Sequence, residues 1–117
     1  LLLSEGAGGW RVPLAADYGC PELARDAGAD VLLVVGLRLG CINHARLSAE
    51  AIQRDGLRLL GWVGNPIEPD MPALAGNLAT LEALLPVPCL GVLPAGPDDA
   101  AFDALAAALT ARRGAAT

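Results

Sequence analysis

The chain has 117 residues, a length that suits one domain, and 54% of them are hydrophobic, which is enough to build a core. Its net charge of −5 and its 3% of aromatic residues argue against a nucleic-acid surface, which needs cations and stacking rings. No apolar run approaches the roughly 20 residues of a membrane span, and no signal peptide is recognisable. We therefore expect a cytoplasmic globular domain that binds neither nucleic acid nor a membrane.

Alternating strand and helix patterns begin at the N-terminus. Leu1–Ser4 predicts the end of a buried strand, and residues 21–27, "PELARDA", predict a short helix that opens with a proline. The apolar run "VLLVVG", residues 31–36, has no alternation and predicts a strand buried on both faces. Residues 41–55 predict an amphipathic helix. Its apolar face consists of Ile42, Ala45, Ala49 and Ile52.

The same alternation continues to the C-terminus. Residues 57–64 and 89–94 predict strands, residues 71–85 predict a helix, and a last helix runs from Asp98 and Asp99 to Arg113, before Gly114. The inner stripe of the helix over 71–85 consists of Leu74, Leu78, Leu81 and Leu85. Strands that alternate with helices predict an α/β fold with a parallel β-sheet flanked by helices.

Three cysteines and one histidine are too few and too scattered for a disulfide framework or a zinc site, so we expect reduced thiols at Cys20, Cys41 and Cys89. We expect a core or surface role for His44. The chain contains no lysine, because all eight basic residues are arginines, and it does not begin with methionine. We therefore expect that a segment N-terminal to Leu1 is missing.

Ligands of open parallel sheets bind beyond the carboxyl ends of the strands, which directs attention to the segments that follow them. These segments are expected to meet at one edge of the sheet. They contain an acid with glycines, a helix start, an amide and further glycines, which together resemble the contents of a nucleotide site. The four segments are residues 5–9, 36–45, 65–72 and 94–99.

Each of these segments also has an ordinary structural interpretation. Glu5 is a candidate Mg²⁺ ligand beside glycines that let the backbone approach phosphates, or a solvated acid beside a flexible turn. The helix start at Gly40–Asn43 offers free N–H groups to an anion, or is simply capped, and Cys41 there is a thiol of lowered pKa or an apolar filler. Asn65 matches the hydrogen-bonding edge of adenine, or forms a turn before Pro66.

Four stretches together carry a family resemblance: "EGAGGW", "VVGLRLGCINHA", "GWVGNPIEPDMP" and "PCLGVLP". They resemble dethiobiotin synthetase, the ATP-dependent ring-closing enzyme of biotin synthesis, from Leu1 to about Gly96. The resemblance implies a homodimeric ligase of the P-loop NTPase fold. Such an enzyme takes 7,8-diaminononanoate, CO₂ and ATP as substrates, with Mg²⁺ as cofactor.

The resemblance also implies roles for individual residues, although it assigns no catalytic residue in this part. Glu5 matches the magnesium-binding glutamate, Asn65 the residue that recognises adenine, and Leu39–Asn43 the helix start that receives the substrate carboxylate across the dimer. The remaining implied ATP-binding residues are Gly6, Ala7, Gly8, Gly9, Pro94, Ala95 and Gly96. The implied substrate-binding residues are Leu39, Gly40, Cys41, Ile42 and Asn43.

Several features depart from the family pattern. Ser4 replaces a usual valine, Pro66 replaces a variable residue, and no site is assigned in residues 97–117. The phosphate-binding motif "GTDTxVGKT" is not present, and a chain without lysine cannot form one. The resemblance therefore implies that residues 1–117 are the C-terminal half of a P-loop-type domain, inactive alone. The alternatives are an amidotransferase-type relative similar to cobyrinate amidases, or a non-catalytic nucleotide-sensing or dimerisation module.

Overall fold

A computed structural model of the chain describes residues 1–115, and the last two residues of the expected C-terminal tail lie outside this range. The elements, in chain order, are β1 (Pro13–Ala15), β2 (Tyr18–Gly19), α1 (Cys20–Asp26), β3 (Val31–Leu37), α2 (Cys41–Arg54), β4 (Leu59–Pro66), α3 (Leu74–Leu84), β5 (Cys89–Val92) and α4 (Asp99–Ala115). Within residues 1–115, no helix is long and apolar enough to cross a membrane.

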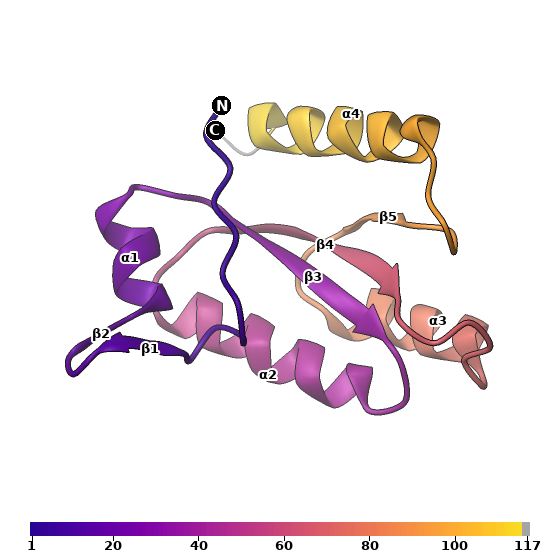
Figure 1. The fold of residues 1–117 in the computed structure, drawn as a ribbon, viewed down its shortest axis with the longest axis horizontal. Helices are drawn as coiled ribbons and strands as arrows, with labels where there is room; N and C mark the ends of the chain where they lie inside the picture. Colours follow the sequence, from indigo (N-terminus) through magenta and orange to yellow (C-terminus); the bar gives the residue numbers. More distant parts are fainter. Residues whose placement is uncertain (116–117) are drawn as a thin grey trace.

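A parallel three-stranded sheet of order β3-β4-β5 forms the centre of the fold, which confirms the predicted α/β class. Helices α2 and α3 lie on one side of the sheet, and α4 lies on the other side, against β4 and β5 (Figure 1). Each strand-to-strand connection passes through a helix, as a parallel sheet requires. Asp98, the residue before α4, caps this helix, because its Oδ1 accepts a hydrogen bond of 2.9 Å from the N–H of Ala101.

The main core lies between the sheet and the helices α2 and α3. Trp62 of β4 and Leu81 of α3 are both 0% exposed, and Ile52 of α2 is 1% exposed. The predicted apolar face of α2 is confirmed, with three of its four residues buried and Ile42 partly buried. The indole N–H of Trp62 is buried, and residues 1–115 provide no acceptor for it.

The strand predicted over Leu1–Ser4 is wrong, because no strand within residues 1–115 pairs with this segment. Leu1 is 93% exposed, so an apolar sequence alone did not make it a buried strand. The prediction that residues 31–36 are buried on both faces is also wrong. Val34 of β3 is 59% exposed, because α4 covers the far faces of β4 and β5 rather than that of β3.

Smaller differences have local causes. The antiparallel β1–β2 hairpin was not predicted, since strands of three and two residues are too short to show a period. Helix α3 begins three residues late, because Ala73 has φ of 55°, outside the helical region. Leu74, now the first residue of the helix, is 38% exposed instead of lying on the inner stripe. The predicted strands over 57–64 and 89–94 are observed at 59–66 and 89–92, and Gly114 lies inside α4 rather than beyond it.

Two leucines of α3 test where the core lies. We expect Leu81→Ala to lower the free energy of unfolding by about 2–5 kcal/mol, because it leaves a cavity beneath the sheet. Leu84 is 48% exposed, so Leu84→Ala serves as the matched control, with an expected loss of about 0.5–1 kcal/mol. Urea unfolding measures both, and equal losses would contradict the packing described here.

Candidate functional site

The carboxyl ends of β3, β4 and β5 bring two of the predicted segments together. Asn65, the second-last residue of β4, lies opposite Gly36 of β3 in the parallel register, and its side chain is exposed. On the other side of β4, the N–H of Leu93 donates a hydrogen bond of 2.9 Å to the carbonyl oxygen of Gly64. Pro94–Gly96 therefore follow directly beside Asn65, as a shared binding site for one ligand would require.

The start of α2 lies at the same edge, four residues after the end of β3. Gly40 occupies the N-cap position with φ of 92°, a conformation that glycine adopts without strain. No side chain caps this helix end, which argues against the ordinary capping interpretation. The N–H of Cys41 donates to the carbonyl oxygen of Arg38 at 3.1 Å, so the amides of Ile42 and Asn43 are the ones left at this end for an anion.

The side chain of Cys41 faces inward. It is 2% exposed, and its Sγ lies 3.9 Å from Oδ1 of Asn77. The apolar-filler interpretation of this thiol therefore fits its surroundings. His44 is exposed on the following turn and lines a cavity of about 330 Å³ between β3 and α2, together with Arg38 and Ile67.

Glu5 and its glycines occupy a different place. Residues 5–9 are exposed, and Gly8 and Gly9 have φ of 91° and 112°, which only glycine adopts easily. In Figure 1 this first, indigo part of the chain lies well apart from the arrowheads of β3 and β4. The expectation that all four segments share one edge is thus not met, because Leu1–Ser4 does not join the sheet. No group of three or more histidine, cysteine or acidic residues gathers anywhere within residues 1–115.

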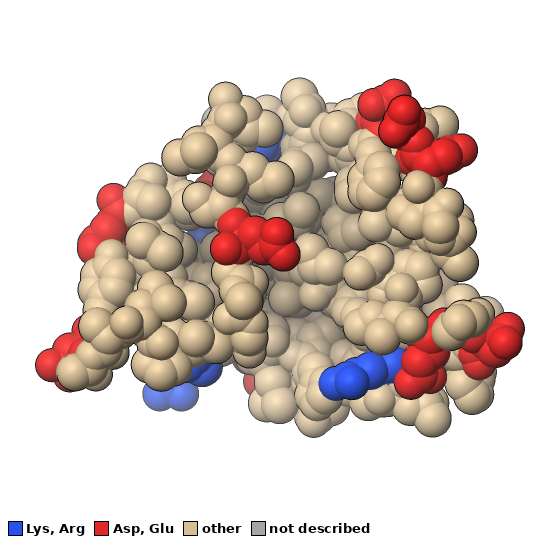
Figure 2. Space-filling view, viewed as in Figure 1, with Lys and Arg blue, Asp and Glu red and all other residues tan. Residues whose placement is uncertain are grey.

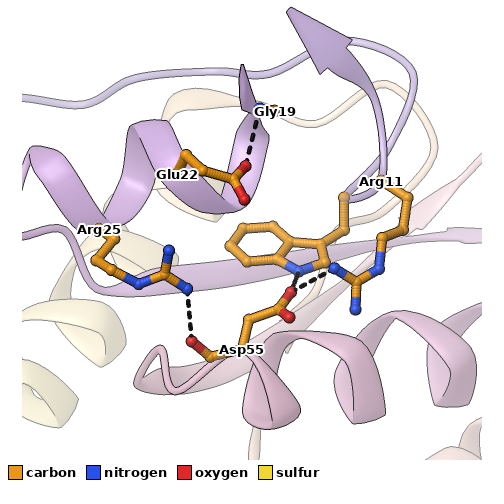
Figure 3. A network of polar contacts seen from close by, with 6 residues as sticks. Arg11, Gly19, Glu22, Arg25 and Asp55 are labelled. Atoms are coloured by element: carbon orange, nitrogen blue, oxygen red, sulfur yellow. Dashed lines mark hydrogen bonds and ion pairs between the residues drawn. The ribbon is translucent and has the colours of Figure 1, made fainter. Parts of the chain in front are cut away.

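A polar network that was not predicted follows this loop directly (Figure 3). Oδ2 of Asp55 accepts a hydrogen bond of 2.7 Å from Nε1 of Trp10 and pairs with Nη1 of Arg11 at 2.7 Å. The backbone oxygen of Asp55 accepts a further bond of 2.8 Å from Nη2 of Arg25 in α1. Asp55 is the C-cap residue of α2, so the network holds the loop at the end of α2 opposite Gly40.

One sequence signal could have indicated that Asp55 needs a partner, without identifying that partner. A negative charge at the C-terminal end of a helix opposes the helix macrodipole and needs a compensating partner. Asp55 sits at such an end, and its partners are 44 and 45 residues away in the sequence. The hydrogen bond from Trp10, and then the contacts with Arg11, hold the pKa of the Asp55 carboxyl below its usual value, although partial burial opposes this.

Charged side chains are sparse on the face shown in Figure 2, which is mostly uncharged and carries separate acidic groups. At the lower right of Figure 2, basic and acidic groups lie side by side near the carboxyl end of β3. The edge that brings together Asn65, Pro94–Gly96 and the start of α2 is therefore neither a broad cationic nor a broad anionic surface. Its recognition groups are amides, backbone N–H groups and a helix end.

The fold and this edge define the chain as an open α/β domain of the kind that binds ligands beyond the carboxyl ends of its parallel strands. The profile of a family described as "AAA domain" matches residues 1–100, and the chain belongs to this family. This membership agrees with the P-loop NTPase-like fold that the sequence predicted.

Proteins with the name "ATP-dependent dethiobiotin synthetase BioD" are similar to the chain over most of its length, which confirms the resemblance. The protein from Pseudomonas paraeruginosa (strain DSM 24068 / PA7) is 60% identical over 99 residues, covering 81% of this chain and 43% of the relative. The protein from Cellvibrio japonicus (strain Ueda107) is 56% identical over 92 residues, covering 79% and 40%. The chain thus spans less than half the length of these relatives.

The lowered pKa of Asp55 predicts a specific loss of stability in acid. A carboxyl with a lowered folded pKa stabilises the protein above its unfolded pKa of about 3.9 and loses that contribution as the pH falls through the folded value. We expect the free energy of unfolding to fall more steeply from pH 5 to pH 3 in the wild type than in Asp55→Asn. Glu50→Gln, a control on the exposed side of α2, should keep the wild-type slope. Parallel curves for wild type and Asp55→Asn, from urea unfolding at each pH, would contradict the network.

Proposed function

We propose that this chain is the C-terminal half of an ATP-dependent dethiobiotin synthetase, which joins CO₂ to 7,8-diaminononanoate and closes the ureido ring with ATP. The observation that carries the proposal is 56–60% identity over about 80% of the chain to proteins of that name. The phosphate-binding loop, which needs a lysine that this chain lacks, is proposed to lie in the preceding half of the enzyme. The chain alone is then inactive.

In this proposal the edge beside β4 binds the adenine. The amide of Asn65 can both donate and accept hydrogen bonds, as the edge of adenine requires, and Pro94–Gly96 line the same place. What supports this is the pairing of β4 with β5, which brings the two segments together from positions almost thirty residues apart. Asn65 is exposed, so its amide is free to meet a ligand.

Glu5 is proposed to serve the other end of the nucleotide. Mg²⁺ prefers oxygen ligands, keeps several waters and is commonly held by one or two carboxylates together with substrate phosphates. A single exposed carboxylate beside a glycine-rich backbone fits this coordination preference. The bound ion would neutralise charge on the phosphates. Because metal and adenine lie at opposite ends of ATP, the separation of Glu5 from Asn65 is compatible with one nucleotide.

The uncapped start of α2 is proposed to bind the distal carboxylate of the diamine in the neighbouring subunit of a homodimer. Leu39, Gly40 and Asn43 are exposed there, and the amides of Ile42 and Asn43 point out of the helix end. The positive end of a helix stabilises an anion by about 0.3–1 kcal/mol when exposed and up to about 2 kcal/mol when partly buried. The side chain of Cys41 is buried and faces Asn77 of α3, so it is not proposed to contact the carboxylate.

The decisive experiment assays the complete enzyme for dethiobiotin formation from the diamine, CO₂ and ATP. We expect activity, and we expect Glu5→Gln to shift the magnesium activation curve by roughly tenfold or more while leaving unfolding nearly unchanged, because the charge it removes holds the metal. Glutamine-dependent amidation instead would support the amidase-type alternative. ATP binding without turnover would support the non-catalytic module, and an unchanged magnesium curve would make Glu5 a solvated turn residue.

The adenine assignment has its own test. We expect Asn65→Ala to raise the KM for ATP about five- to thirtyfold, because an unpaired base edge costs roughly 1–2 kcal/mol. The KM for GTP should change much less, so the KM for GTP divided by the KM for ATP falls. Gln53→Ala, which removes an exposed amide near the C-terminal end of α2, is the matched control. If Asn65→Ala leaves the ratio of the two KM values unchanged, the adenine assignment is refuted.

A further inference from the structure

The glycine-rich loop needs an external restraint. Its residues are exposed, the chain before it makes no strand, and Gly8 and Gly9 occupy backbone conformations that leave many alternatives open. A carboxylate at Glu5 can hold a metal in one place only if this backbone is fixed. Within residues 1–115, the contacts that restrain this backbone are made by the residues that follow the loop.

Those residues converge on a single carboxylate. Trp10 comes directly after Gly9, packs partly buried against the core, and donates its indole N–H to Asp55 Oδ2 at 2.7 Å. Arg11 pairs with the same oxygen at 2.7 Å, and the Asp55 side chain is only 17% exposed. Residues 10 and 11 thus attach the loop to the end of α2 across 44 and 45 positions of sequence.

The two contacts differ in strength for a physical reason. Arg11 is 59% exposed, and an exposed ion pair contributes little. The indole N–H of Trp10 is partly buried and loses its acceptor if the carboxylate is removed, which is costly. Asp55 is in turn held from behind, because Arg25 of α1 donates to its backbone oxygen at 2.8 Å (Figure 3).

We propose that Asp55 is a positioning residue for the glycine-rich loop of Glu5–Gly9 and thereby sets how tightly the enzyme binds magnesium–ATP. This inference rests on the proposed function of Glu5. Asp55 touches neither metal nor nucleotide in this arrangement, and acts only through Trp10 and Arg11. Because Asp55 also ends α2, the helix whose first turn is proposed to bind the diamine, one rigid element connects the two proposed sites.

The first arm of the test measures the loop itself, without any assumption about activity. Hydrogen–deuterium exchange of the complete protein is followed in peptides that cover residues 5–11. We expect Asp55→Ala, which removes the acceptor of the indole N–H, to speed exchange there at least threefold, and Glu50→Ala on the same helix to leave it unchanged. Trp10→Phe, which keeps an aromatic ring but removes the indole N–H donor and part of the buried ring, is the second variant and should also speed exchange. Unchanged exchange in both variants would overturn the proposal.

The second arm measures catalysis. We expect Asp55→Ala to raise the KM for ATP and the magnesium activation constant about three- to tenfold, below the 10–100-fold typical of a group bonded directly to a metal ligand. The KM for the diamine should stay within twofold. A purely structural role would lower the active fraction and leave these constants unchanged, which would overturn the link to magnesium–ATP. If the wild type makes no dethiobiotin, the proposed function fails, and the exchange arm alone still decides whether Asp55 holds the loop.

Discussion

The burial of β4 is the constraint on which the rest of the structure depends. Within residues 1–115, β4 has a paired strand on each side, and helices α2 and α3 cover one of its faces while α4 covers the other. A parallel strand in this position must be apolar throughout, and Leu59 to Gly64 are all buried. Gly61 is required for the same reason, since a Cβ there would lie 2.8 Å from Cγ of Leu90 and 2.9 Å from the oxygen of Pro88.

Rigid support of this kind has a direct consequence for the proposed adenine site. Asn65 is the first exposed residue after six buried ones, so its backbone position is set by the core rather than by a loop. Side chains on a sheet are positioned more precisely than those on free loops. The neighbouring segment Pro94–Gly96 is positioned in the same way, because the hydrogen bond from Leu93 to Gly64 attaches the residue before it to β4.

The loop of Glu5–Gly9 represents the opposite case. Within residues 1–115 it belongs to no strand or helix, and it is attached through the partly buried Trp10 and through polar contacts with one aspartate at the end of α2. Polar contacts at a partly exposed position are weaker and more sensitive to pH than the burial of an apolar strand. The two ends of the proposed nucleotide site would therefore differ in rigidity, with the adenine end fixed by the core and the metal end adjustable.

The sequence by itself determined the order of the elements from Pro21 onward, the parallel sheet and the faces of α2, because these follow from periodicity within each segment. It also determined the motifs that carry the family resemblance, since those are short and local. Asn65 could be named because it directly follows the strand predicted over residues 57–64.

Only the tertiary structure decided which segments found partners. The apolar residues Leu1–Leu3 look like a strand, yet a strand forms only where a neighbour supplies hydrogen bonds, and none of residues 1–115 does so. Val34 lies in an apolar run that predicts burial, yet it is exposed. The placement of the helices, and not the apolar character of the strand, determines which faces of β3 are covered. The contact of Trp10 with Asp55 joins residues 45 positions apart, and no local pattern encodes such a pairing.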